Sequence, residues 1–496
     1  MRRLQEVAET GNSNVTEARV EKEIAEVVRA LRRAVDAKVG LDCSFADRER
    51  AALDIGNEAQ RRLLEQELRA IAAAHGRDIA INDVHYRHFR PGSQDYVSLC
   101  GFLTVPRSTY REVGVRNGPT LVPLDLQAGL VEGATPAMAY RVALGYAKDH
   151  SRSMAEDLRA SHRVPPSRTK LENMSKQIGA EAKRHAATIE AYLRQSERLP
   201  EGATGISVGL DRTAVPMEEA RAADAQPKTR RKKRTKPYQR KPPAPVDVNY
   251  HMAYVGTVSI TDQYGDTLVA RRYASTPTEG PDEVVRSMMA DVRNALRRDK
   301  NLKVGIVQDG SPEMWNLVRP ALKEQARVAN WEEAIDRYHL NKRLGKVLKV
   351  IEPVVAERKP QLHQWNEELD VDDVTIDRIE ERISCEMEHR DDANELAVLQ
   401  DNATFIANNK DRMRYVALRR MGLPVGSGVT EGACRWVIGE RAKRASRRWH
   451  ENGLAAALAL RSIYCSDRLP RFFARFQKLY TADVREADER ESRVAA

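Results

Sequence analysis

Apolar residues recur at helical spacing over the first 75 residues of the chain. Apart from the adjacent pair Val27 and Val28, neighbouring members of this set lie three or four positions apart, which is the spacing of one face of an α-helix. The set comprises Val20, Ile24, Val27, Val28, Leu31 and Val35. A second helical pattern follows in ERAALDIGNEAQRRLLEQELRAIAAAHG, and charged residues occupy the other faces. We therefore expect residues 1–76 to form a helical region that packs as a hairpin or a coiled coil, with a second subunit as one candidate partner.

The pattern changes twice between residues 77 and 200. Residues 77–132 alternate in DIAINDVHYRHF, YVSLCGFLTVPRSTYREVGV and PTLVPLDL, which predicts a small β module. Residues 133–200 then predict a helix, a short helix, a Pro-containing turn and a third helix. This order is typical of a helix-turn-helix DNA-binding region, with a recognition helix from about Ser167 to Gly179. An ordinary helical hairpin has the same pattern and stays open as an alternative.

Residues 201–475 predict a mixed α/β domain. Three strands are expected first, in GISVGLDRTAVPM, NYHMAYVGTVSITD and DTLVARRYAS, and two strand–helix alternations follow through LKVGIVQDG and EEAIDRYH. A basic loop, 218–247, separates the first two strands, and an all-helical insertion is expected at about 341–422. Three antiparallel strands continued by parallel βα units are the order of an RNase H-like fold, whose first and fourth strands are neighbours. Residues 476–496 lack apolar periodicity, and we expect a solvated tail there.

Length and composition narrow the class of protein. A chain of 496 residues suggests about three domains, and 41% hydrophobic with 31% charged residues is too apolar for general disorder. No apolar run is long enough to span a membrane, and MRRLQEVAETGNSNV has no apolar core like that of a secretory signal. Five scattered cysteines form no CxxC pair, so neither a zinc ribbon nor a thiol-redox motif is supported.

Positive charge is concentrated in two places. The net charge is +10, and the segment Lys228–Lys241 alone holds nine basic residues and no acid. A second cluster, Arg435–Arg448, has six basic residues and one acid. Such clusters favour a polyanion, most often nucleic acid, although a solubilising loop is the alternative. The DNA-binding residues expected from these clusters are Arg230, Arg231, Lys232, Lys233, Arg234, Arg444, Arg447 and Arg448.

Three carboxylates stand out against this strand order. Asp211 lies in the first predicted strand of the α/β domain and Asp309 ends the fourth, so the two side chains should converge. Carboxylates that converge repel each other unless a cation lies between them, and oxygen ligands suit Mg²⁺ or Mn²⁺. Two such ions can activate a nucleophile and stabilise the leaving oxygen of a phosphodiester. Glu431, at the start of a helix after the insertion, supplies the third carboxylate.

Each acid also has a simpler interpretation. Asp211 could be a strand-end residue paired with a nearby arginine, and Asp309 begins an ordinary Asp-Gly turn. Glu431 could complement the dipole of its helix. Asp262 and Asp266 compete for the first position, but they flank the predicted hairpin turn and should be exposed. Only the combination of three acids on these elements, beside a basic segment, favours a catalytic site.

These residues, taken with their neighbours, resemble a known family. The motifs are GLDRTAVPM, VQDGSPEMWNL, DRYHL and GSGVTEGACRWVIGERAKRASRRW, spread over roughly residues 90–470. They are similar to the DDE transposases of bacterial insertion sequences, and most of all to the Mutator-related group, which carries a D-x-x-H element. Here that element runs from Asp336 to His339.

The resemblance implies a DNA transposase with an RNase H-like core. Such an enzyme binds the terminal inverted repeats of its element and catalyses Mg²⁺-dependent strand cleavage, followed by strand transfer of the freed 3′-hydroxyl into target DNA. Asp211, Asp309 and Glu431 would hold two Mg²⁺ or Mn²⁺ ions, and His339 would act with Asp336 beside them. A helix-start histidine bonded to Asp336 is the alternative. The resemblance also implies double-stranded DNA as partner, at least a dimer on DNA, and a bacterial, nucleoid-associated cytoplasmic location.

One departure from the family concerns zinc. Relatives carry a cysteine zinc ribbon before a PLD segment, but here REVGVRNGPT precedes VPLDLQAGL and has no cysteine. We therefore expect no zinc, and a β module held by packing alone. Two other functions stay open: a catalytically silent, domesticated transposase acting as a sequence-specific DNA-binding protein, and an RNase H-like, structure-selective nuclease such as a junction resolvase.

Overall fold

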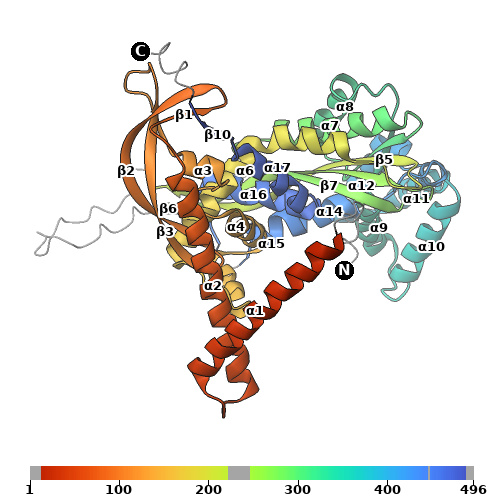
Figure 1. Cartoon of the computed structure of the whole chain (residues 1–496). Helices are drawn as coiled ribbons and strands as arrows, with labels where there is room; N and C mark the ends of the chain where they lie inside the picture. The colour runs from red at the N-terminus through yellow and green to blue at the C-terminus, as the bar shows by residue number, and fades with distance from the viewer. Residues whose placement is uncertain (1–12, 222–245, 445–446, 488–496) are drawn as a thin grey trace, which may run out of the picture. The chain divides into compact units, whose positions relative to one another are not determined.

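A computed structural model of the chain describes residues 13–221, 246–444 and 447–487 (Figure 1). The protein is a mixed α/β structure with two five-stranded sheets and many helices. It divides into two compact units. The first unit comprises Met1–Gly145, His150–Met174 and Gln477–Ala496, and the second comprises Tyr146–Asp149 and Ser175–Phe476. Within the described ranges, no helix is both long and apolar enough to cross a membrane.

The first unit begins with two helices and an antiparallel sheet. The expected helices are α1 (Ser13–Val39) and α2 (Phe45–Ala73). The sheet has the order β10-β1-β2-β3-β4. Its strands are β1 (Asp78–Ile81), β2 (Val84–Ser98), β3 (Gly101–Glu112), β4 (Thr120–Leu121) and β10 (Val484–Glu486). Apolar residues of α2, β2 and β3 form a common core, among them Leu68, Tyr96, Leu103 and Val105. The two predicted helices are therefore present as α1 and α2, and most of the predicted β segments are present as β1 to β4.

Two segments of the first unit differ from the expectation. PLDLQ, expected to be β-like, forms the short helix α3 (Pro123–Gln127), because a proline with fixed φ and no N–H suits the first position of a helix. Residues 476–496, expected as a tail, contain β10. This strand pairs with β1, with Ile79 opposite Glu486. A partner strand far away in the sequence supplies the order that local periodicity does not predict.

Three helices follow the β module. They are α4 (Pro136–Lys148), α5 (Ser151–Ala160) and α6 (Arg168–Ser196). The third helix runs for 29 residues, well beyond the predicted recognition segment. At Gly179 a Cβ atom would lie 2.8 Å from the Cβ of Ala456, so α6 and α16 approach closely there. The C-terminal end of the predicted recognition segment is thus engaged in helix packing, and a DNA-reading role for its exposed start stays a prediction.

The second unit is built on the sheet β7-β6-β5-β8-β9. Its strands are β5 (Gly205–Ala220), β6 (Val246–Thr261), β7 (Thr267–Ser275), β8 (Lys303–Gln308) and β9 (Glu332–Ile335). The first three pair antiparallel, whereas β8 and β9 run parallel to β5. The first and fourth strands, β5 and β8, are neighbours, as the predicted strand order requires.

Helices cover both faces of this sheet (Figure 1). Ile206, Val208 and Leu210 of β5 pack in one core with α7 (Asp282–Arg298) and α8 (Pro312–Glu324). Val215 and Met217, on the alternate face, pack against the segment that follows the insertion. That segment comprises α14 (Gly428–Ala433), the π-helix η2 (Cys434–Gly439), α15 (Glu440–Ala442) and α16 (Glu451–Cys465). The last helix of the second unit is α17 (Leu469–Leu479), of which Phe476 is the last residue in that unit.

The insertion between β9 and α14 is helical, as expected. Its elements are α9 (Arg337–Ile351), α10 (Arg358–Val371), α11 (Thr375–Glu388), α12 (Ala393–Asn409), the 3₁₀ turn η1 (Lys410–Arg412) and α13 (Tyr415–Arg420). Apolar residues from these helices, including Leu340, Leu369 and Ile406, join the large core under the sheet. The insertion is therefore packed onto the domain that it interrupts.

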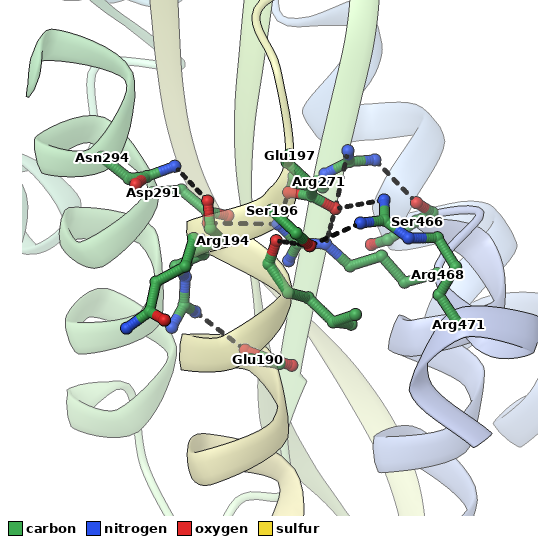
Figure 2. A network of polar contacts seen from close by, with 12 residues as sticks. Glu190, Arg194, Ser196, Glu197, Arg271, Asp291, Asn294, Ser466, Arg468 and Arg471 are labelled. Carbon is green, nitrogen blue, oxygen red and sulfur yellow. Dashed lines mark hydrogen bonds and ion pairs between the residues drawn. The ribbon is translucent and has the colours of Figure 1, made fainter. Parts of the chain in front are cut away.

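A buried network of charges ties four elements of the second unit together (Figure 2). Arg194 of α6 donates to Asp291 of α7, with Nε 2.7 Å from Oδ1. Arg468, just before α17, donates to both carboxylate oxygens of Glu197 and to the Tyr273 hydroxyl of β7. Burial raises the pKa of Asp291. The charges of the two arginines lower it by a larger amount, so the net pKa is below the usual value. Asp291 is therefore ionised in the interior.

Candidate active site

Three aspartates align across three neighbouring parallel strands: Asp309 and Asp336 directly follow β8 and β9, and Asp211 lies within β5, just beyond the part of β5 that pairs with β8. Residues that pair between β5 and β8 are separated in the sequence by the same number of positions as Asp211 and Asp309. Residues that pair between β8 and β9 are likewise separated by the same number of positions as Asp309 and Asp336. Continuing both registers therefore places the three residues in one row across β5, β8 and β9. The carboxyl ends of parallel strands are the usual place for binding sites in such sheets.

Asp211 lies on the face of β5 that α14 and η2 cover. Its Oδ2 accepts a hydrogen bond from Cys434 Sγ at 3.2 Å, and its Oδ1 accepts from the backbone N–H of Arg212. Burial raises the pKa of the Cys434 thiol, and the negative charge of Asp211 raises it further. The thiol therefore keeps its proton and acts as a donor to Asp211. The expected pairing of Asp211 with an arginine side chain is not seen among the described residues.

Asp309 follows β8 directly, at an exposed position. Its Oδ1 accepts from the backbone N–H of Ser311 at 2.9 Å, which makes a local Asx turn. Gly310 has a φ of +93°, and a Cβ there would lie 2.9 Å from the ring of Phe405. The turn interpretation is thus correct for the backbone. The turn leaves Oδ2 of Asp309 available for a role in the site, because no hydrogen-bond partner of that oxygen is found within the described part of the chain.

Asp336 and His339 form a tight pair at the start of α9. Asp336, only 1% exposed, accepts from the backbone N–H and the Nδ1 of His339, at 3.0 and 2.7 Å. It also accepts from the backbone N–H of Ser427 at 2.6 Å. Burial raises the pKa of Asp336, but these bonds outweigh it and the net pKa is lowered. The hydrogen bond to Asp336 raises the pKa of His339, with smaller contributions from the charges of Asp309 and Glu431.

Glu431 is presented from α14. The neighbouring Thr430 bonds Thr257 of β6 through their hydroxyls at 2.7 Å, and it packs so closely on Gly209 of β5 that a Cβ there would clash. Glu431 Oε1 lies 3.5 Å from His339 Nδ1. Burial raises the pKa of Glu431, the charges of Asp336 and Asp211 raise it further, and His339 opposes them.

The structure thus brings the predicted site residues into one neighbourhood. Its tightest group is Asp336, His339 and Glu431, whose potential ligand atoms all lie within 4.8 Å of one another. Asp211 and Asp309 are linked to this group through their charges, which act on Glu431 and His339 respectively. Within the described ranges, no lysine or arginine forms a salt bridge with Asp211, Asp309 or Glu431. A group of carboxylates whose negative charge is only partly offset by His339 and Lys342 is chemically suited to a divalent cation.

The predicted DNA-binding residues fall into two sets. Arg230, Arg231, Lys232, Lys233 and Arg234 lie outside the described residues. The second set is described and engaged in ion pairs. Arg444 contacts Glu440 at 2.8 Å, Arg447 contacts Asp149, and Arg448 contacts Glu218. Their contact with DNA stays a prediction.

The basic cluster Arg435–Arg448 is not carried by one helix over its described residues. Helix α15 ends at Ala442, before Lys443 and Arg444. Arg441 is 2% exposed and lies between the rings of Tyr146 and Trp449, at 4.7 and 4.6 Å. Its guanidinium donates to the Tyr146 carbonyl oxygen at 3.0 Å. Arg441 is therefore a packing residue, because aromatic faces and a carbonyl oxygen stabilise its charge away from water.

Sequence reasoning missed the residues that position the acids. Cys434, Thr430 and Ser427 each contact the site or its scaffold, through Asp211, Thr257 and Asp336. One signal was present for Cys434, since it lies one helical turn after Glu431 and so faces the same side. The contacts of Thr430 and Ser427 depend on tertiary packing that local patterns do not contain.

No protein-family model matches the chain, and no curated protein matches it significantly.

Proposed function

We propose that this protein is a DNA transposase that cleaves and transfers DNA strands at the site formed by Asp211, Asp309 and Glu431. One observation carries the proposal: two of these acids fall into the row across β5, β8 and β9, and the third, on α14, lies beside His339, which is bonded to Asp336 of the same row. A helix dipole or a turn alone gives no reason for three distant segments to bring carboxylates together.

The architecture of the second unit supports the proposal. Three antiparallel strands followed by two parallel βα units, with a helical insertion before the last acidic helix, are the arrangement expected of an RNase H-like transposase core. The insertion brings the chain back so that Ser427 donates to Asp336 just before Glu431. This bond joins the two sides of the insertion at the site.

Asp211, Asp309 and Glu431 are the residues that would hold Mg²⁺ or Mn²⁺. Their fit is chemical: all three offer carboxylate oxygens, and the described lysines and arginines leave them without a salt bridge. Such ions, when bound, supply activation of a water or a 3′-hydroxyl and stabilisation of the leaving oxygen of a phosphodiester.

The remaining residues of the site orient these acids. Cys434 holds Asp211 through its S–H donor, and Asp336 fixes the ring of His339 through Nδ1. His339 in turn lies beside Glu431 and offsets part of the negative charge there. The pair Asp336–His339 therefore serves as a positioning element, which fits the D-x-x-H segment of the sequence.

A cleavage assay tests the proposal. The protein is incubated with Mg²⁺ and an end-labelled fragment that carries the terminal inverted repeats flanking its gene. We expect a nick with a 3′-hydroxyl at the repeat end, and loss of this product in Glu431→Gln. The matched control is Glu440→Gln, a partly exposed acid nine positions later that contacts Arg444 and should leave cleavage unchanged.

Other outcomes would support the alternatives. Tight binding of the repeats without cleavage by the unaltered protein would indicate a silent DNA-binding protein. Cleavage of four-way junctions without dependence on the repeats would indicate a structure-selective nuclease. Cleavage that persists in Glu431→Gln would remove Glu431 from the site.

A further inference from the structure

Two large aromatic side chains are exposed at the edge of the site. Trp436 and Tyr338 are each 54% exposed. The chain has five tryptophans, and the other four are buried or partly buried: Trp315, Trp331, Trp365 and Trp449. An exposed tryptophan sacrifices more apolar burial than most other residues, so its position beside the acids needs a reason.

Tyr338 lies between the two members of the Asp336–His339 pair in the sequence. Its ring meets the His339 ring edge-on, with centroids 5.9 Å apart. The Lys342 ammonium lies 4.0 Å from the centre of the Tyr338 ring. Because His339 Nδ1 lies 3.5 Å from Glu431 Oε1, this aromatic–cation pair borders the acidic cluster.

Trp436 lies in the π-helix η2, directly after α14. Its Cδ1 is 4.0 Å from where a Cβ on Gly432, the neighbour of Glu431, would stand. The guanidinium of Arg435 lies 5.3 Å from the centre of its ring. The buried Arg461 donates two hydrogen bonds to the Trp436 carbonyl oxygen, at 2.7 and 2.9 Å. A π-helical turn held in this way marks a functional position in many proteins, because it displaces a side chain from the regular helix face.

The geometry points to a base-stacking platform: Tyr338 and Trp436 receive unpaired DNA bases next to the phosphodiester that the acids act upon. This inference rests on the proposed function and adds to it the form of the substrate, a strand that is locally unpaired at the site. Aromatic rings bind any nucleobase by stacking, and cations such as Lys342 and Arg435 suit the adjoining phosphates. A protein partner would instead favour a larger continuous apolar patch, and each ring here is bordered by charged residues.

Binding without divalent metal tests the platform separately from cleavage. Labelled duplexes that are fully paired, or that carry a short run of unpaired bases at one end, are titrated in EDTA. We expect the unaltered protein to bind the unpaired form more tightly. Trp436→Ala and Tyr338→Ala should each weaken binding of that form by roughly 5- to 100-fold, the range for loss of one stacked base. Binding of the paired duplex should change little.

The controls separate stacking from folding. Trp436→Phe and Tyr338→Phe retain an aromatic ring and should restore most of the lost affinity. Tyr264→Ala removes a 73% exposed tyrosine of the β6–β7 turn and should have no effect. Quenching of Trp436 fluorescence by the unpaired strand, absent in Trp436→Phe, gives a second readout.

The failures of the two proposals are distinguishable. Three results would overturn the platform. The alanine variants could lose affinity for both DNA forms equally, or lose affinity for neither. The protein could also bind RNA of the same sequence more tightly than DNA. If the protein also cleaves fully paired ends, the proposed function still stands. Preference for unpaired bases that depends on Trp436, with no cleavage in Mg²⁺, supports the platform and contradicts the transposase.

Discussion

Arg468 shows how much of this molecule depends on single buried charges. It is 3% exposed, and it donates to Glu197, Tyr273 and Asp291. Arg471, one turn later, contacts the same Glu197 but has a side chain that is 50% exposed. Both arginines appear in Figure 2, and they form a matched pair because they share a carboxylate and differ in burial.

Replacing Arg468 should destabilise the second unit strongly. Arg468→Met removes the group that bonds both oxygens of Glu197 and one of the two arginines that contact the buried Asp291, and breaking such a pair costs about 3–5 kcal/mol. Arg471→Met should cost less than about 1 kcal/mol, since an exposed pair is screened by water. All five tryptophans lie in the second unit, so tryptophan fluorescence during urea unfolding measures this difference. Equal losses in the two variants would contradict the assigned role of burial.

Glu190 should make stability depend on pH. Burial raises its pKa to about 7, although Arg194 and Arg468 lower it and Asp291 and Glu283 add to the rise. The folded protein therefore keeps this proton to higher pH than the unfolded chain. Stability from this group is present below the unfolded pKa near 4.5 and is lost as pH rises towards 7. Glu190→Gln should flatten the fall in urea midpoint between those values; an unchanged pH profile would show that Glu190 does not titrate there.

At the scale of elements, the placement of α14 on β5 decides whether the acids meet. Gly209 leaves the space that Thr430 occupies, and the Thr430–Thr257 bond fixes the helix there. Glu431 is the next residue along α14. The distance between Glu431 and the aspartate row therefore depends on Gly209 of β5, because only a residue without a side chain leaves room for Thr430 there.

Gly209→Ala should displace α14. The added methyl group meets Thr430 in a packed interior, which costs about 1–3 kcal/mol and moves Glu431. A small displacement of a catalytic group lowers the rate on the order of 10- to 100-fold. Gly345→Ala in α9, where nothing lies within 4 Å, is the control and should stabilise by about 0.5–1 kcal/mol without loss of cleavage. Full activity in Gly209→Ala would show that α14 tolerates the shift.

Elements with a strong periodic signal could be predicted from the sequence, and elements set by tertiary partners could not. The strands β5 to β9 and the helices of the insertion were expected, because alternation and helical spacing are local properties. β10 pairs with a strand some four hundred residues earlier, so no local pattern announces it. The short helix α15 ends where Arg441 turns inward, a contact that depends on Tyr146 and Trp449.

The candidate site could be predicted in outline for the same reason. The strand order alone put Asp211 beside Asp309, and the register now supports that placement. The third member of the row, Asp336, was expected only as a partner of His339. Its alignment with the other two aspartates needs the β8–β9 register, which no single-sequence pattern provides.

At the scale of the whole molecule, the surplus positive charge should govern binding of DNA. The net charge of +10 is smaller than the local charge of the two basic clusters taken together. Replacing the five predicted residues Arg230, Arg231, Lys232, Lys233 and Arg234 with alanine should reduce the slope of log affinity against log salt by up to about 4. Fluorescence anisotropy across a salt series measures this slope, and an unchanged value would exclude phosphate contacts by this segment.

The central claim is that Asp211, Asp309 and Glu431 form one divalent-cation site. Electron paramagnetic resonance of free Mn²⁺, titrated with the protein, measures that site directly. We predict that Asp211→Asn, Asp309→Asn and Glu431→Gln each weaken Mn²⁺ binding at least about tenfold, the smallest loss expected when a group that holds or orients a metal is removed. Asp262→Asn, at the exposed β6–β7 turn, should bind like the unaltered protein. Mn²⁺ affinity that is undetectable in the unaltered protein, or the same in all four variants, would contradict the account.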